Sequence, residues 1–289
     1  MGARRVQGNF NLASYVVATS QAVEPYDLVG YAAATVTRAA DQTWASAIST
    51  PSAPTVAASA ASRGTALTNA ATGVKVAIQL PWGEGTLSSA GSATPTAAYG
   101  LKVTLAACPS PGLGWNVYVE DSAGSGTYLF QQFVPASTAP TIIYVDSYGA
   151  GAAPGTLNAS GSAVAQGAKE VTQYNFCKTF LGVSNQRMAT TGFFGAPTRP
   201  FGNSVDNQIM ICRGGVFEFD TASASYAEGA YVGPAKASGN ALLSQTVAAV
   251  AHPTLAIGKV FKLTSSSTKV MVEIMSRFTT PAPTVANPW

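Results

Sequence analysis

The chain has a single histidine, His252, and this is the first residue to consider for catalysis. A Ser-His-Asp site needs a histidine as its base, so in this sequence it could be assembled only through His252. The neighbours Val250, Ala251 and Pro253 supply neither an acid nor a nucleophile, and the chain contains no Gly-x-Ser-x-Gly motif. The sequence therefore predicts a turn or surface histidine and no catalytic residue of this kind.

Paired carboxylates are the second route to hydrolysis, because glycosidases place two acids on either side of the bond that they break. The candidates are Glu120 with Asp121, Asp146, and Glu218 with Asp220. They are few and separated along the chain, so ordinary turns and a solvated strand face explain them better than a catalytic pair. The one-three-five spacing of acidic calcium loops is also absent from the sequence.

Cofactor and metal motifs are missing too. Cys108, Cys177 and Cys212 are an odd number with no Cys-x-x-Cys spacing, so we expect buried free thiols and no zinc site. The run 149–154, GAGAAP, imitates a dinucleotide-binding fingerprint, but proline holds the last glycine position and no helix is predicted after it. We expect no cofactor and no metal, and we predict that residues 149–167 form a flexible linker.

The charge of the chain excludes further function classes. Charged residues make up only 10% of the sequence, and the net charge is +3. The basic residues are scattered from Arg4 to Arg277 without a cluster, so we expect no nucleic-acid partner. No run approaches the roughly 18 apolar residues of a membrane span, and the first residues lack the pattern of a secretory signal. We therefore expect folding in a reducing cytoplasm and no membrane partner. A surface with so little charge suits a protein that packs against neighbours.

The elements that position these residues are predicted to be strands. Apolar residues alternate with polar ones in 74–80, where one face is expected to be buried and the other wet. The stretches 101–105, 115–119 and 142–145 read as strands as well, and so does 270–274. Helix signals are weak, so the sequence predicts an all-β fold.

Proline and glycine mark the borders of an inserted segment. Pro51-Ser52-Ala53-Pro54 opens it, and the Gly- and Ala-rich run 149–167 closes it. About a hundred residues lie between, which is the size of one β-sandwich with about seven strands. We therefore predict an inserted sandwich over 51–165 and a second domain made of the two flanking pieces, 1–50 and 166–289.

Three stretches of this segment form one pattern: 51–54, PSAP; 83–89, GEGTLSS; and 114–119, GWNVYV. Together they resemble fibronectin type III and related Ig-like modules of phage virion proteins, which often carry a Gly-Glu-x-x-x-Ser turn and a Tyr-bearing strand before a Gly-rich hairpin. The Cys…Trp…Cys spacing of antibody domains is absent. The resemblance therefore implies an Ig-like sandwich without an intersheet disulfide.

A second pattern lies in the flanking pieces, at 214–219 (GGVFEF), 227–233 (AEGAYVG), 257–260 (IGKV) and 270–274 (VMVEI), with 26–30 (YDLVG) and 180–184 (FLGVS) upstream. It resembles a family of small capsid cement proteins, the head decoration proteins of tailed bacteriophages. The resemblance implies a small β-barrel-like decoration domain that is formed from N- and C-terminal segments and interrupted by the sandwich. Insertion of a domain at an exposed loop costs little, because the entropy of loop closure grows slowly with length.

Aromatic residues gather in one stretch that is too rich in glycine and proline for regular structure. Phe193, Phe194 and Phe201 lie there beside Arg199, and Trp289 ends the sequence given. Either this stretch covers its own core, or it docks on another subunit or the capsid, where aromatic residues and arginine are common anchors. We take these five residues as the candidate interface.

The sequence thus favours a non-enzymatic virion protein that binds the outer surface of the phage capsid and stabilises it. Its expected partners are the major capsid protein and further copies of itself, in a homotrimer that the family resemblance suggests. An alternative is a carbohydrate- or receptor-binding fibre or tail protein, which would bind host-surface glycan by stacking on Trp82, Trp115, Tyr118 and Tyr128 of the sandwich. A glycan-degrading enzyme is the third and least supported hypothesis.

Overall fold

The computed structural model describes residues 4–7, 12–16, 22–32, 35–42, 47–59, 67–96, 99–156, 162–185, 208–239 and 241–277. Strands make up 48% of the chain and helices are few, so the predicted all-β class is confirmed. The chain divides into two compact units: Met1–Ser46 with Ala168–Trp289, here called the barrel unit, and Ala47–Gly167, the sandwich unit. The predicted segment 51–165 begins four residues inside the sandwich unit and ends two residues before its last residue.

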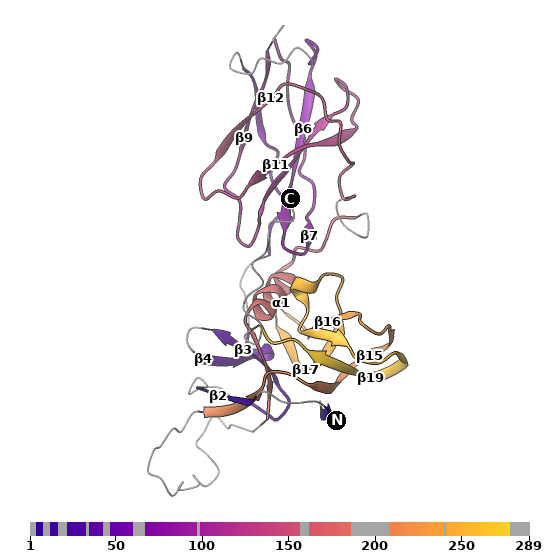
Figure 1. Cartoon of the computed structure of the whole chain (residues 1–289). Coiled ribbons are helices and arrows are strands. Elements are labelled where there is room, and N and C mark those ends of the chain that lie inside the picture. The colour runs from indigo at the N-terminus through magenta and orange to yellow at the C-terminus, as the bar shows by residue number, and fades with distance from the viewer. Residues whose placement is uncertain are drawn as a thin grey trace, which may run out of the picture. The chain divides into compact units, whose positions relative to one another are not determined.

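A closed five-stranded barrel is the centre of the first unit (Figure 1). Its strands are β15 (Val216–Tyr226), β16 (Tyr231–Lys236), β17 (Leu242–Ala249), β18 (Gly258–Val260) and β19 (Thr264–Ile274). They pair in the order β15-β17-β16-β18-β19, and β19 pairs again with β15, which closes the ring. All five strands come from the C-terminal segment. The N-terminal segment adds only β1 (Arg4–Gln7), which pairs with the start of β15.

The barrel interior follows from alternation along its strands. Phe217 and Phe219 on β15 point into the core, whereas Glu218 between them is half-buried. On β19, Val270 and Val272 alternate in the same way and complete the packing against β15. Burying each such side chain stabilises a fold by about 1.5–3 kcal/mol, so a continuous apolar core can hold this small ring together.

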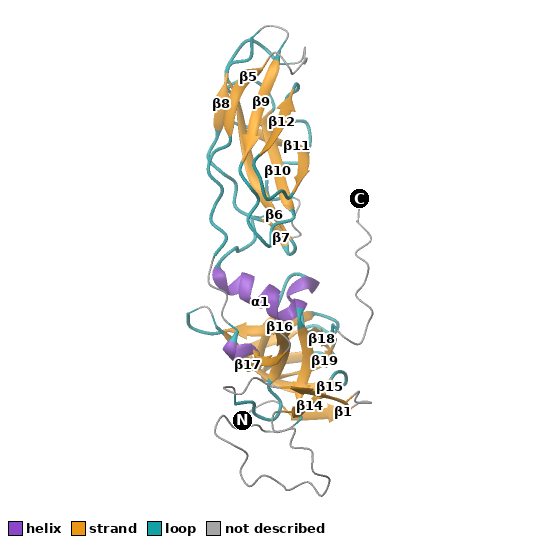
Figure 2. Cartoon of the chain, turned by 90° about the vertical axis from the view of Figure 1, so that its left-hand side faces the viewer, coloured by secondary structure: helices purple, strands orange, loops and turns teal. Residues whose placement is uncertain are grey.

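One helix, α1 (Ala168–Lys178), belongs to the barrel unit and lies over β16 (Figure 2). It contributes Phe176 and Cys177 to the barrel unit's core. We did not predict this helix, because the helix signals in the sequence are weak. The reason is that Thr172 and Gln173 are buried together with the apolar residues, so the helix shows no clean apolar stripe.

A second sheet of the barrel unit combines the two flanking segments. Its strands, in the order β2-β14-β13-β3-β4, are β2 (Leu12–Val16), β14 (Gln208–Cys212), β13 (Phe180–Ser184), β3 (Leu28–Ala32) and β4 (Thr35–Arg38). Alternate residues serve two cores: Leu28 and Phe180 pack in the main core, whereas Val29, Leu181 and Ile211 form a separate apolar cluster. This sheet therefore combines strands from the N- and C-terminal segments, whereas the barrel ring itself needs only the C-terminal segment.

The second unit is a sandwich of two antiparallel sheets (Figure 1). The larger sheet runs β11-β10-β6-β7, with β8 on β6, and consists of β6 (Thr72–Leu80), β7 (Gly83–Glu84), β8 (Gly91–Ala93), β10 (Gly114–Glu120) and β11 (Tyr128–Pro135). The smaller sheet runs β12-β9-β5 and consists of β5 (Thr55–Ser59), β9 (Gly100–Leu105) and β12 (Thr141–Val145). The described part of this unit thus holds eight strands, where the sequence predicts about seven.

The larger sheet is covered on both faces, which corrects the prediction of a wet face on 74–80. Ala77 is buried although it lies between the core positions Val76 and Ile78, and every residue of β10 is buried. Part of the cover is the run that we predicted to be a flexible linker. The amide of Gly149 donates to the Glu120 carbonyl at 3.0 Å, and the amide of Phe130 donates to the Ala152 carbonyl at 2.9 Å.

Small side chains explain why this run packs so closely. A Cβ on Gly149 would lie 2.3 Å from the Val119 carbonyl oxygen, so only glycine allows the backbone to approach the sheet at this point. The described parts of the run, 149–156 and 162–167, are here called the strap. A composition that we read as flexible is one that also permits close backbone packing.

Candidate functional site

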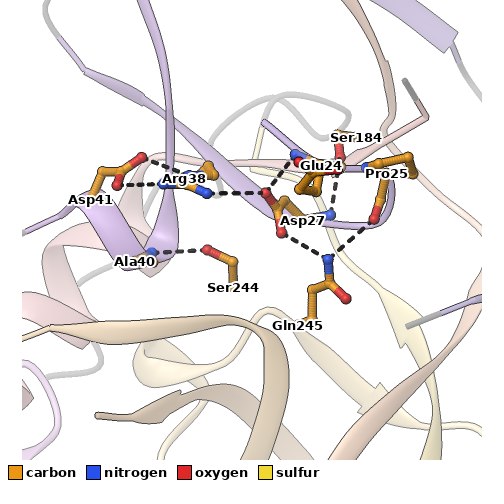
Figure 3. Close-up of polar contacts among 9 residues, drawn as sticks. All are labelled: Glu24, Pro25, Asp27, Arg38, Ala40, Asp41, Ser184, Ser244 and Gln245. Atoms are coloured by element: carbon orange, nitrogen blue, oxygen red, sulfur yellow. Dashed lines mark hydrogen bonds and ion pairs between the residues drawn. The ribbon is translucent and has the colours of Figure 1, made fainter. Parts of the chain in front are cut away.

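A buried carboxylate, Asp27, organises the polar contacts of the barrel unit (Figure 3). Its Oδ2 accepts the amide of Glu24 at 2.8 Å, and its Oδ1 accepts Nε2 of Gln245 at 3.1 Å. Its own amide donates to Oγ of Ser184 at 3.0 Å. The Arg38 guanidinium lies 3.9 Å from Oδ2. Asp27 is 3% exposed, so these protein groups surround it almost completely.

The groups around Asp27 come from separate elements. Arg38 ends β4, Ser184 ends β13, and Gln245 lies on β17 of the barrel. The cluster therefore joins the second sheet to the barrel. Burial raises the pKa of Asp27, while the Glu24 amide, Gln245 and Arg38 oppose this rise. A carboxylate enclosed in this way positions chain segments, and it has no exposed surface on which to act on a substrate.

Glu84 is the corresponding centre of the sandwich unit and is 1% exposed. Its Oε1 accepts Nδ2 of Asn116 at 2.9 Å and the hydroxyl of Tyr118. Its Oε2 accepts the amide of Gly155, in the strap, at 2.8 Å. Burial and the adjacent Glu84 raise the pKa of the Tyr118 phenol, which therefore stays protonated and acts as a donor. Glu84 thus fastens the strap to the outer face of the larger sheet.

Glu120, one of the acids considered for hydrolysis, is a loop anchor. Its Oε2 accepts the amide of Gly73 at 2.7 Å and that of Gly124 at 3.2 Å, and its Oε1 accepts the amide of Gly126 at 3.0 Å. These bonds hold the loop between β10 and β11 against β6. Asp220, another of those acids, forms an ion pair with Lys269 on the neighbouring strand β19. Glu120 and Asp220 are thus occupied by a loop and by a lysine.

His252 serves local structure as well. Its Nδ1 lies 2.8 Å from Oγ1 of Thr254 and accepts the amide of that residue at 3.3 Å, so it caps the short 3-10 helix η2 (Pro253–Leu255). Burial lowers the pKa of His252, which favours the neutral ring. Within the described ranges, no group of three or more His, Cys, Asp or Glu residues could hold a metal ion.

The three cysteines are free thiols. The predicted burial is found for Cys177 and Cys212, whereas Cys108 is half-buried.

The aromatic residues proposed for sugar stacking are mostly in the core, which corrects that part of the fibre hypothesis. Trp82 and Trp115 are each 5% exposed, and their indole N–H groups donate to backbone carbonyls of the same unit. Tyr118 is fully buried against Glu84. Tyr128 is half-buried, and Nζ of Lys75 lies 4.2 Å from its ring centre. None of the first three can present a ring face to a glycan.

The candidate interface residues Phe193, Phe194, Arg199, Phe201 and Trp289 all lie outside the described residues. Their assignment stays a prediction.

Exposed apolar side chains elsewhere offer contact surfaces that sequence reasoning missed. On β12, Ile142 is 50% exposed and Tyr144 is 48% exposed. At the turn between β18 and β19, Leu263 is 66% exposed and Phe261 is 40% exposed. The signal for β12 was present in the sequence, since 142 and 144 occupy alternate positions of one strand. What the sequence lacks is the information that, among the described residues, no layer covers this face.

Comparisons with known proteins give no relative. No family model matches the sequence, and neither a curated protein nor a solved structure matches it. None of the described helices is long and apolar enough to cross a membrane. The buried carboxylates therefore have to be interpreted from their own geometry, which is that of structural anchors.

Proposed function

We propose that this chain is a non-enzymatic structural protein, a decoration or cement subunit that binds the outer surface of a tailed-phage head. The observation that carries the proposal is the location of the residues that resemble the cement family. Four of the six stretches, 214–219, 227–233, 257–260 and 270–274, fall on or beside β15, β16, β18 and β19 of the closed barrel. The other two, 26–30 and 180–184, fall on or beside β3 and β13 of the second sheet, so all six belong to the barrel unit. A resemblance that coincides with one structural unit is stronger than one scattered over several.

The placement of polar groups supports a contact function. Asp27, Glu84 and Glu120 are buried and hold backbone segments together, and Asp220 is paired with a lysine. These four acids are therefore engaged in structural contacts, which supports a non-enzymatic role. Few charges are left for the surface, which lowers the cost of removing water from it at a protein contact.

The sandwich unit is built as an insert. The amide of Ile48 donates to the carbonyl of Gln166 at 2.9 Å, so the two ends of the unit lie side by side. Adjacent ends allow a domain to be inserted into a loop of another domain without disturbing it. In the proposed assembly the barrel unit binds the major capsid protein, and the sandwich projects outward.

Binding to the shell would depend on many copies. Single contacts can be weak, because a subunit held by several partners on a symmetric lattice gains avidity. We expect the capsid-bound form to be a homotrimer, with Phe193, Phe194, Arg199, Phe201 and Trp289 among the contacts.

Cryo-EM of intact virions that contain this chain tests the proposal. Hundreds of copies on the shell are expected of a cement subunit, and a handful of copies at the tail would instead support the fibre alternative. A variant in which a short Gly-Ser bridge replaces residues 48–166 should still bind undecorated heads. If binding to heads requires the sandwich unit, the capsid contact does not lie on the barrel unit, and this part of the proposal is wrong.

The fibre alternative keeps little support. Three of its four stacking residues are buried, so a host-surface glycan would have to bind elsewhere on the sandwich. The fourth, Tyr128, is half-buried, and Nζ of Lys75 lies 4.2 Å from its ring centre.

A further inference from the structure

The barrel unit is made of two segments that are far apart in the sequence. Its N-terminal strands β1, β2 and β3 each pair with a strand that follows the sandwich unit, namely β15, β14 and β13. The hydrogen bond from the Asp27 amide to Ser184 joins residues 157 positions apart. Closing so long a loop of unfolded chain costs entropy before any contact in the barrel unit repays it. The folding of this unit therefore depends on how its two segments meet.

The sandwich unit has a core of its own. The main core of the barrel unit and its separate apolar cluster consist of residues outside 47–167. Val76, Leu101 and Val117 are buried within the sandwich, and among the described residues its strands pair only with one another. A domain with its own core and its own sheets can fold without its neighbour. During synthesis the whole sandwich also precedes residues 168–289 of the barrel unit.

The folded sandwich holds its own two ends together. The amide of Ile48, near its start, donates to the carbonyl of Gln166, near its end, at 2.9 Å. The end is fixed to the larger sheet as well. The amide of Val164 donates to the carbonyl of the last residue of β7 at 2.8 Å, and Nε1 of Trp82 donates to the carbonyl of Ala165 at 2.9 Å. Ile48 and Trp82 are each 5% exposed, so the protein shields this junction from water.

We propose that the sandwich unit folds first and thereby speeds the folding of the barrel unit. With the sandwich folded, the chain between Asp27 and Ser184 is shortened from 157 residues to the stretches 27–48 and 166–184, about 40 residues in all. The probability of closing a flexible loop falls with about the 3/2 power of its length, so this roughly fourfold shortening makes the encounter about eightfold more frequent. The insertion is thus a folding aid for the domain that it interrupts, whatever the barrel unit binds.

A thiol on β3 reports when the two segments of the barrel unit meet. Val29 is fully buried and packs in one cluster with Leu181, Ile209 and Ile211, which all follow the sandwich in the chain. The thiol of a Val29→Cys variant is therefore protected only after the N-terminal segment has docked. In a Cys108→Ser background, refolding from urea is interrupted at set times by a pulse of an alkylating reagent, and mass spectrometry of the peptides measures labelling at position 29.

Two replacements of residues 48–166 are compared with the native insert. A Gly-Ser chain of the same length keeps the long loop but has no fold, whereas a short Gly-Ser bridge joins the two ends directly. We expect protection of position 29 to be about eightfold slower with the long Gly-Ser chain and within about twofold of the native rate with the short bridge. A long Gly-Ser chain that allows the native rate overturns the proposal, and so does a short bridge that is as slow as the long chain.

The order of events in the chain with its native sandwich is an independent test. Trp82 and Trp115 are buried in the sandwich, so in a Trp44→Phe, Trp289→Phe background their fluorescence follows the folding of that unit. The proposal requires this fluorescence to recover before position 29 is protected. Protection that comes first overturns the proposal, even where a Gly-Ser variant fails to fold. Neither measurement needs a phage head, so a failure here and a failure of capsid binding are observed in separate assays.

Discussion

Replacing Glu84 by alanine should destabilise the sandwich unit strongly. The change leaves three buried donors without their acceptor: Nδ2 of Asn116, the Tyr118 hydroxyl and the Gly155 amide. Each unsatisfied buried donor costs about 1–3 kcal/mol, and entry of water into the vacated space would recover part of that. Asn116 also keeps its bond to Gln79, 3.0 Å long. We therefore expect a loss of about 3–5 kcal/mol in the free energy of unfolding.

Urea unfolding of the full chain, followed by tryptophan fluorescence, measures this loss. Trp82 and Trp115 are buried in the sandwich unit, so replacing Trp44 and Trp289 by phenylalanine confines the signal to that unit. The Tyr118→Phe variant removes one donor and leaves the carboxylate, and should cost only about 1–2 kcal/mol.

Asp146→Ala is the matched control, because it removes an exposed carboxylate from the same unit and should change stability by less than about 0.5 kcal/mol. If the Glu84→Ala variant stays within about 1 kcal/mol of this control, Glu84 does not fasten the strap, and the structural role assigned to it is wrong.

Three further predictions concern the barrel unit. The raised pKa of Asp27 means that the folded chain binds its proton more tightly than the unfolded chain, so its contribution to stability is full below the ordinary value of 3.8 and is lost as pH rises through the folded-state pKa. Asp27→Asn should remove this loss, and urea unfolding of both proteins between about pH 4 and pH 7 should show a flatter pH dependence for the variant; equal slopes would contradict it. Gly182→Ala should cost more than about 2 kcal/mol, because its φ is +152° and a Cβ would lie 2.1 Å from a carbonyl oxygen of β14. The comparison variant Gly124→Ala, in the sandwich unit at φ +70° with open space around it, should lower the melting temperature much less. Changing Phe194 and Phe201 to serine should leave the melting temperature unchanged and weaken self-association or capsid binding by about 1–3 kcal/mol per residue; a large fall in melting temperature with intact binding would make them core residues.

Strands could be predicted from the sequence because their signal is local. The stretches 101–105, 115–119 and 142–145 lie within β9, β10 and β12, and 270–274 lies within β19. In each, apolar and polar residues alternate or β-branched residues dominate, and both patterns reflect the geometry of one strand. The hairpin from β10 to β11 was equally readable, since a Gly- and Ser-rich stretch separates two such runs.

What the sequence could not supply are contacts between distant elements. Helix α1 is hidden because Gln173 is buried and bonds to the carbonyl of Pro234, 61 residues away. The strap was mistaken for a linker because its glycines fit both roles, and the sheet that it covers is recognised only in three dimensions. Glu84 lies in a turn motif by sequence, yet its partners are 32, 34 and 71 residues further on. No local pattern contains such pairings.

The buried carboxylates also bear on function. The chain has 13 acidic residues, and Asp27, Glu84 and Glu120 among them are almost fully enclosed by groups of the protein itself. An enzyme that used such groups would need one face of the carboxylate open to its substrate, whereas here the oxygens accept backbone and side-chain donors that hold a turn, a strap and a loop. Burying these acids removes negative charge from a surface that has little charge to begin with. Removing water from a surface with few charges costs little free energy, which favours contact with other proteins. The scarcity of charge and the inward acids therefore both support the proposed function, in which the chain acts through protein contacts.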